Sequence, residues 1–154
     1  MERGRARRRR GRRAVSPPDH AFCVELEVPF HDVDSQRVVW HGHYLKYLEI
    51  ARCALLRARG LDVEQVVALG YQFMVGESRC RHLRPLTYGS RFRVTAWFVE
   101  VEQCLDIEYE LFDLTENRRC AKARTMLVAT DLQGRMCLAT PGPILERLPR
   151  LAPQ

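Results

Sequence analysis

Long apolar runs are missing from this chain of 154 residues. No stretch of about eighteen consecutive apolar residues occurs, so the sequence predicts no transmembrane helix. Apolar residues nevertheless make up 46% of the chain, which is typical of a globular protein. The length suits one domain that can bury a sizeable core. We therefore expect a single folded domain.

Several motifs of known chemistry are also absent. The sequence contains no glycine-rich phosphate loop, no dinucleotide-binding fingerprint and no Gly-x-Ser-x-Gly elbow. Six cysteines are present, but no two have the short spacing of a zinc knuckle. They fall mostly in apolar or strand-like stretches, which predicts reduced, largely buried thiols in a cytoplasmic protein. We expect no metal and no cofactor.

Excess charge of one sign is confined to the beginning of the chain. The net charge is +6, but residues 1–13 hold eight arginines and one glutamate. The rest of the chain has 17 basic and 18 acidic side chains and is nearly neutral. Residues 1–20 lack apolar periodicity and include Pro17 and Pro18, so we expect a disordered tail. No apolar stretch follows the arginines, which argues against a signal peptide.

The arginine-rich tail leaves two interpretations open. Arginines neutralise phosphates without sequence preference, so the tail would suit contact with nucleic acid or an anionic membrane. The alternative is a solvated extension without a partner, or a start codon assigned too far upstream.

Residue periodicity predicts strands on both sides of one long helix. Apolar and polar residues alternate over 22–28 and then, after the helix, at about 71–83, 89–102, 104–114 and 118–131. Residues 42–59 carry apolar side chains at helical spacing, and a short second helix is expected at 63–69, capped by Asp62. This order is α+β. Because the long helix is apolar on more than one side, we expect the sheet to curl around it.

The ends of the predicted domain are less regular. We expect the folded domain to span residues 21–148, followed by a short tail at 149–154. Four prolines occur between 141 and 154, and this segment is expected to cover an edge of the sheet.

The segment Val28–Gly60 contains the residue types of a catalytic site. It reads VPFHDVDSQRVVWHGHYLKYLEIARCALLRARG. Asp32 and Asp34 follow a strand-like run, and two histidines precede the long helix. A carboxylate near the positive end of a helix can act as base or nucleophile, and free backbone N–H groups there can bind an oxyanion. On the residues alone, an aspartate that caps the helix or accepts from loop N–H groups is the alternative.

This segment resembles the signature of hotdog-fold acyl-CoA thioesterases of the 4-hydroxybenzoyl-CoA thioesterase type. It is most similar to the subgroup associated with the Tol-Pal system. The matching residues are Asp32, Asp34, Val38, Val39, Trp40, His41, Tyr44, Leu45, Glu49, Ala51 and Arg52. The resemblance implies the hotdog fold, a curved antiparallel sheet of about five strands wrapped around one long central helix. It also implies a homodimer or homotetramer, with active sites between subunits.

The resemblance further implies roles for individual residues. Asp34 would be the catalytic carboxylate, which attacks the thioester or activates water. The backbone N–H of His41 would donate to the thioester oxygen, and its imidazole would orient Asp34, shuttle a proton or assist the leaving thiolate. Asp32 would hold the loop by hydrogen bonds. The predicted substrate-binding residues are Arg37, Trp40, His43 and Tyr44.

Arg37 is the main departure from the family pattern, which usually has glycine at this position. A bulky cation after Asp34 would contact a carboxylate or phosphate of the substrate, or point outward. It also puts the family's backbone path at this residue in question. Further candidates for nucleotide phosphates are Arg79, Arg81, Arg84 and Arg91.

Three other interpretations stay open at this stage. The first is a hotdog enzyme that dehydrates or hydrates acyl thioesters. The second is a module that binds an acyl thioester or a partner without turnover. A set of polar residues also resembles a metal-ligand cluster, although the resembled enzymes need no metal: His31, Asp32, Asp34, His41 and His43. We favour a thioester hydrolase of lipid or polyketide metabolism that acts on acyl-CoA or acyl carrier protein.

Overall fold

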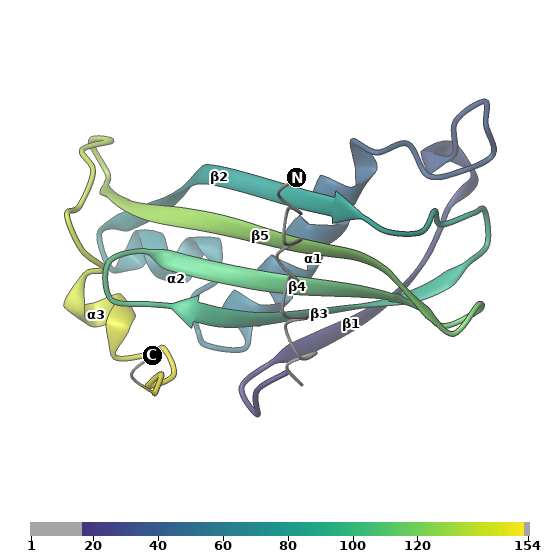
Figure 1. Cartoon of the computed structure of the whole chain (residues 1–154). Helices are drawn as coiled ribbons and strands as arrows, with labels where there is room; N and C mark the ends of the chain where they lie inside the picture. The colour runs from purple at the N-terminus through teal and green to yellow at the C-terminus, as the bar shows by residue number, and fades with distance from the viewer. Residues whose placement is uncertain (1–16, 153–154) are drawn as a thin grey trace, which may run out of the picture.

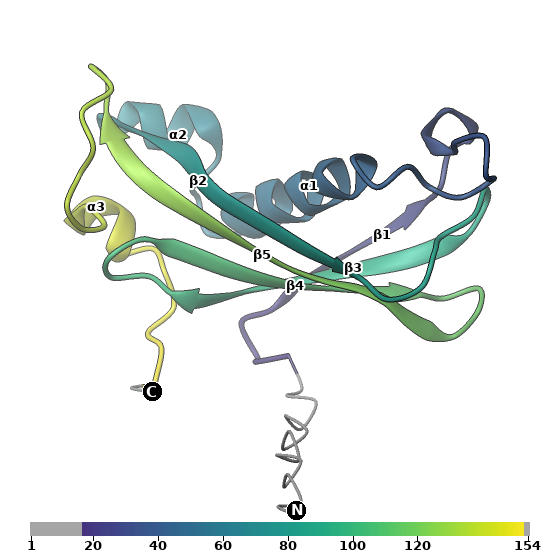
Figure 2. The same cartoon turned by 45° about the horizontal axis from the view of Figure 1, so that its top comes forward.

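A curved antiparallel sheet wraps around one long helix in the computed structural model, which describes residues 17–152 (Figures 1 and 2). The strands are β1 (Phe22–Glu27), β2 (Tyr71–His82), β3 (Arg91–Glu100), β4 (Leu105–Asp113) and β5 (Arg118–Asp131). They form one sheet in the order β1-β3-β4-β5-β2. Helix α1 (His43–Arg57) lies along the concave side and contacts β1, β2 and β3. The predicted α+β hotdog architecture is therefore confirmed.

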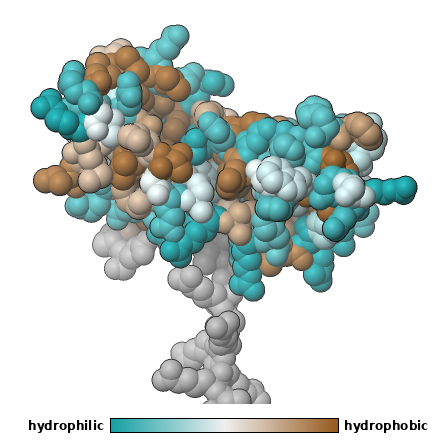
Figure 3. Space-filling model, turned by 90° about the horizontal axis from the view of Figure 1, so that it is seen from above, coloured by the Kyte–Doolittle hydropathy of each residue, from teal (hydrophilic) through white to brown (hydrophobic). Residues whose placement is uncertain are grey.

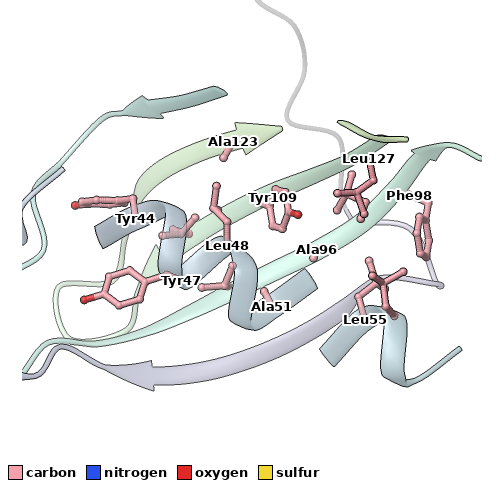
Figure 4. Packing of buried hydrophobic residues seen from close by; sticks show 14 of the residues in the cluster. Tyr44, Tyr47, Leu48, Ala51, Leu55, Ala96, Phe98, Tyr109, Ala123 and Leu127 are labelled. Carbon is pink, nitrogen blue, oxygen red and sulfur yellow. The ribbon is translucent and has the colours of Figure 1, made fainter. Parts of the chain in front are cut away.

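The core forms where the apolar stripe of α1 meets the inner face of the sheet. Side chains one or two turns apart on the helix are almost fully buried, among them Tyr44, Leu48, Ala51 and Leu55. They point toward the sheet, as Figure 4 shows. Their partners on the strands include Ala96, Phe98, Tyr109 and Leu127. Burying one large apolar side chain stabilises a fold by roughly 1.5–3 kcal/mol, so this interface fixes α1 against the sheet.

Local signals set the ends of the helices. After α1 the chain turns at Gly60, which has φ +66° and so takes the left-handed conformation that glycine adopts without a steric penalty. Helix α2 (Val63–Ala68) begins with a capping box, in which the Asp62 side chain and Gln65 satisfy each other's backbone N–H groups. The predicted cap at Asp62 is confirmed.

The structure differs from the sequence prediction at the C-terminal end of the domain. The segment after β5 does not lie along an edge strand; α3 (Gly142–Leu145) lies at the end of the sheet near the β3–β4 turn, where Thr140 N–H donates to Glu102. Ile144 explains the position of α3, because its side chain is fully buried in the core only when α3 lies at this end of the sheet. The predicted disordered tail at 1–20 lies outside the described residues apart from 17–20.

The thiols are less uniformly buried than their sequence surroundings predicted. All six cysteines are free, Cys120 is buried and four others are half-buried, but Cys23 is exposed. The reason is that Cys23 lies on β1, an edge strand, with its side chain on the face away from α1.

Candidate active site

A small hairpin connects β1 to the start of α1. The predicted loop begins with one turn of 3-10 helix, η1 (Phe30–Asp32), and then Val33 pairs with Val39 in an antiparallel bridge. Asp34 and Arg37 close the turn, since Asp34 N–H donates to Val38 and Arg37 N–H donates to Asp34, each at 2.9 Å. The second leg of this hairpin leads directly into α1. Asp34 and the beginning of the helix are therefore held by the same short ladder.

The second leg is in turn fixed to the loop between β2 and β3. Val38 bridges to Thr87, and the N–H of Val39 donates to the carbonyl of Leu86 at 2.9 Å. These backbone bonds tie the hairpin to the sheet on one side, as the right-hand end of Figure 2 shows. The position of Asp34 thus depends on the tertiary fold as well as on its own turn.

Asp34 is half-buried and only partly engaged. Its Oδ1 accepts the backbone N–H of Gln36 at 2.8 Å, an Asx-type turn that orients the carboxyl group. Its Oδ2 accepts no hydrogen bond from any residue in the described part of the chain. One carboxylate oxygen therefore stays available for chemistry.

Two backbone donors lie free at the start of α1. Gly42 occupies the N-cap position and offers no side-chain cap. Within residues 17–152, the N–H groups of His41 and Gly42 donate to no acceptor. Because the first N–H groups of a helix carry its positive dipole end, they suit a carbonyl oxygen that gains negative charge.

The indole of Trp40 lies over this helix start. A Cβ on residue 42 would meet the ring at 2.1 Å, so glycine at that position allows Trp40 its place. The ring lies 5.0 Å from His41 and 5.4 Å from His43, centroid to centroid, and Trp40 keeps 48% of its surface exposed. An exposed aromatic surface therefore borders the free N–H groups.

Asp32 has a different environment from Asp34, although one residue separates them. Its side chain is fully buried and accepts hydrogen bonds from Lys46 at 2.5 Å and from the Tyr47 hydroxyl at 2.6 Å. Burial opposes its ionisation, but these bonds and the charges of Lys46 and His43 outweigh burial, so the pKa of Asp32 lies below its ordinary value. Asp32 fastens the hairpin to α1 as a buried carboxylate.

The other predicted site residues fall into two groups. His43 lies near the helix start, with Nε2 3.7 Å from Asp32. Tyr44 belongs to the core; its hydroxyl accepts the N–H of Leu86 at 3.3 Å, and burial raises the pKa of Tyr44 to about 12. Arg37 is exposed at the tip of the turn, with φ 64°. The arginine thus takes the left-handed conformation that a glycine would adopt there.

The sequence reasoning missed His82. This residue ends β2, and its ring lies edge-on against Tyr44 with 4.5 Å between centroids. His82 is exposed at the end of β2, but partial desolvation of its ring and the charge of His41 hold the pKa of His82 below its ordinary value. No local motif marks His82, because only the register of β2 against β5 brings it beside the start of α1.

The four arginines proposed for phosphate binding differ in their partners. Arg79 pairs with Glu77, and Arg91 pairs with Glu25. Arg81 and Arg84 form no ion pair within the described residues.

A separate hollow in the described residues lies away from Asp34. It has a volume of about 1100 Å³ and is lined by the β3–β4 turn and the C-terminal segment, including Asp106, Arg124 and Leu148. None of the predicted site residues borders it. The Asp34 region is the stronger candidate, because there a partly free carboxylate and free N–H groups at the start of the long helix α1 belong to one hairpin and the helix that follows it.

Residues 17–152 form neither a metal site nor a membrane-spanning helix. No group of three or more His, Cys, Asp or Glu side chains is arranged to hold a metal ion. The polar cluster noted in the sequence is instead divided, since Asp32 points under α1 while Asp34 closes the turn. In the same residues, no helix is long and apolar enough to cross a membrane.

The amino-acid sequence is similar to proteins of a thioesterase-like family. A family model described as the thioesterase-like superfamily matches residues 28–153. A relative from Synechocystis sp., provisionally named an esterase, is 30% identical over 129 residues, which is 83% of this chain and 74% of the relative. A Bacillus subtilis protein, provisionally named an acyl-CoA thioesterase, is 28% identical over 78 residues, covering 51% of this chain and 56% of that protein.

Solved structures show the same architecture. A hypothetical protein from Aquifex aeolicus superposes with a TM-score of 0.75 and 27% identity, covering 83% of this chain and 99% of that one. A 1,4-dihydroxy-2-naphthoyl-CoA thioesterase from Synechocystis has a TM-score of 0.71 and 19% identity, covering 83% and 95%. At that identity the second likeness concerns the fold alone.

Proposed function

Since this chain belongs to the thioesterase-like superfamily, we propose that it hydrolyses acyl thioesters of coenzyme A or of an acyl carrier protein. The proposal rests on one arrangement above all. The half-free carboxylate of Asp34 and the free N–H groups of His41 and Gly42 lie on a single hairpin and the helix start that follows it.

Each part of this arrangement suits one requirement of thioester hydrolysis. Asp34 would attack the carbonyl carbon directly, or take a proton from the attacking water. The N–H of His41, with that of Gly42, would bind the oxygen that becomes negative. Thiolate is a good leaving group, so one carboxylate and one oxyanion site suffice for turnover.

Nearby side chains would bind the substrate. Trp40 offers an exposed ring next to the helix start, and His43 lies beside it. Arg37, exposed at the turn, would meet a carboxylate or phosphate of the substrate. For Tyr44 we propose a supporting role, because its hydroxyl is already engaged with the β2–β3 loop.

We also propose that the working protein is a homodimer or a larger homo-oligomer. β2 is a twelve-residue edge strand, and no other strand of residues 17–152 pairs with its outer side. Long unpaired edges favour pairing with another strand. Met74 and Val75 on this strand are half exposed. Hydrophobic residues gather at the left of Figure 3, at the end of the molecule that carries α2 in Figure 1.

The finer assignments are part of the same proposal. On the D-x-D signature formed by Asp32 and Asp34, we propose that the chain is of the 4-hydroxybenzoyl-CoA thioesterase type and similar to the Tol-Pal-associated subgroup. A cytoplasmic location and a role in lipid or polyketide metabolism follow from such substrates. The Bacillus subtilis relative supports acyl-CoA as the first donor to test.

The test is release of free thiol from a panel of acyl-CoAs by the native chain and by Asp34→Asn. Asp131→Asn is the matched control, because Asp131 Oδ1 also accepts the N–H of the residue two positions later, at 2.9 Å from Gln133. We expect turnover by the native chain and the control, and loss in Asp34→Asn. Equal rates in all three would refute the role of Asp34, and no release from any acyl-CoA or acyl carrier protein would refute hydrolysis.

A further inference from the structure

His82 lies on the face of β2 that is turned toward α1. Its Cα partner on β5 is Ala121, which is fully buried, and paired residues of an antiparallel sheet share a face. The ring meets Tyr44, a residue of the first turn of α1, at 4.5 Å between centroids. The neighbouring Arg81 points to the opposite face, because successive side chains of a strand alternate. His82 is therefore placed beside the helix start by the register of the sheet.

The other histidines show that this position is unusual. His20 hydrogen-bonds a backbone carbonyl of β3. His31 and His43 each have Nε2 3.7 Å from an oxygen of Asp32. The rings of the other two histidines, His41 and His82, form no hydrogen bond or ion pair with any residue in 17–152.

These two unengaged rings lie close enough to influence each other. The charge of His41 adds to burial in lowering the pKa of His82, so the His82 imidazole is neutral at neutral pH. The ionisable groups that face it are His41, from the loop before α1, and Tyr44, from the helix. A neutral imidazole has one N–H donor and one acceptor, and both are unengaged here.

We propose that His82 contacts the thioester in the site that holds Asp34, and that its N–H donates to the departing sulfur. This inference rests on the proposed function and adds a residue from the opposite side of the site. Water activated by Asp34 forms the new C–O bond, the C–S bond breaks, and its electron pair moves to sulfur; where Asp34 itself attacks, water then cleaves the mixed anhydride and frees Asp34. The proton lost by water passes through Asp34 to the thiolate, while His82 only hydrogen-bonds the sulfur and is unchanged at the end.

Substitutions at His82 separate this role from packing. His82→Phe keeps a ring against Tyr44 but has no donor, whereas His82→Asn keeps an N–H donor. His20→Phe is the matched control, because His20 stacks on Phe98 at 6.3 Å and lies away from the helix start. We expect kcat to fall at least tenfold in His82→Phe with KM and Tm nearly unchanged, and to recover partly in His82→Asn. The control should match the native chain.

Two outcomes would overturn the role of His82. One is native kcat in His82→Phe. The other is a loss of kcat in both variants that is matched by an equal loss of folded protein, which would mean that the ring only packs. Thermal unfolding of each variant is measured in the activity buffer.

A second measurement keeps the inference separate from the proposed hydrolysis. The ring C–H resonances of His82 are followed by NMR while S-octyl-CoA, a thioether that cannot be hydrolysed, is added to the full chain. We expect His82 to shift and His20 to stay in place. In His41→Gln, the midpoint of His82 titration should move to higher pH. If the native chain hydrolyses acyl-CoA but the His82 resonances do not shift with the thioether, the role of His82 is refuted and the proposed hydrolysis is not. If the native chain hydrolyses no acyl thioester, the proposed hydrolysis is refuted instead.

Discussion

The two aspartates of the D-x-D pair are the instructive comparison in this molecule. Asp32 is buried, accepts bonds from two side chains of α1 and has a pKa below its ordinary value. Asp34 closes an exposed turn, accepts one backbone N–H and keeps one oxygen free. The same residue type therefore serves stability in one place and is available for chemistry in the other, because the 3-10 turn directs Asp32 under the helix.

The largest expected effect separates chemistry from stability at Asp34. Asp34→Asn should lower kcat about 1,000-fold, which is roughly 4 kcal/mol of transition-state stabilisation. The amide oxygen can still accept the Gln36 N–H, so urea unfolding should give the native midpoint. A large shift of the midpoint would show that Asp34 supports the fold and would remove the contrast with Asp32.

Asp32→Ala should have the opposite profile. The change leaves the Tyr47 hydroxyl and Lys46 without their acceptor, so we expect a loss of about 2 kcal/mol in the free energy of unfolding. The expected loss of stability is no larger because the Lys46 side chain is 43% exposed, so water can solvate its charge when Asp32 is removed. Urea titration measures it, and activity per folded molecule should fall less than in Asp34→Asn. An unchanged midpoint would contradict the anchoring role.

Acid unfolding provides a further test of Asp32. Because its folded pKa lies below the ordinary value of 3.8, Asp32 contributes stability that is complete above pH 3.8 and is lost as the pH falls through the folded pKa. The native chain should therefore lose stability in this window more steeply than Asp32→Asn. Unfolding free energies measured by urea between pH 6 and about pH 3 check this slope. Parallel curves would contradict the ion pair between the buried Asp32 carboxylate and Lys46.

Gly42→Ala should impair the helix start without unfolding the protein. The backbone of Gly42 is helical, with φ −65°, and accepts alanine, but the new Cβ would displace the Trp40 ring. We expect about a tenfold loss of kcat/KM with little change in Tm, because the half-exposed ring can rotate into solvent. Gly142→Ala is the control, since no atom lies within 4 Å of a Cβ there. Native activity in Gly42→Ala would contradict the placement of the oxyanion site.

The smallest effect is expected at Arg37. Replacing a left-handed residue by glycine relieves a cost of about 1–2 kcal/mol, partly offset by the greater freedom of glycine in the unfolded chain. Arg37→Gly should therefore be more stable by about 0.5 kcal/mol, whereas Arg37→Ala should not. Urea midpoints test the backbone, and KM for acyl-CoA in both variants tests whether the cation binds the substrate.

Much of the architecture was predictable because burial repeats along the sequence. Alternation in 22–28 and 118–131 predicted strands that the structure has as β1 and β5, within a residue at each end. The Asp62 cap was predictable because helix capping is local: its partner Gln65 is only three residues away. The position of α3 was not, because it depends on a backbone bond to the β3–β4 turn and on the burial of Ile144 among distant residues.

The site divides in the same way. Val28–Gly60 by itself indicated that a carboxylate and a helix start belong to one segment, because a hairpin and the helix after it are local in sequence. The choice of Asp34 came from the family resemblance and stays a prediction. Only the tertiary structure decided that Asp32 is buried against Lys46 and Tyr47, that Arg37 takes the left-handed conformation, and that His82 joins the helix start. Burial and strand register depend on residues far apart along the chain, and no short pattern records them.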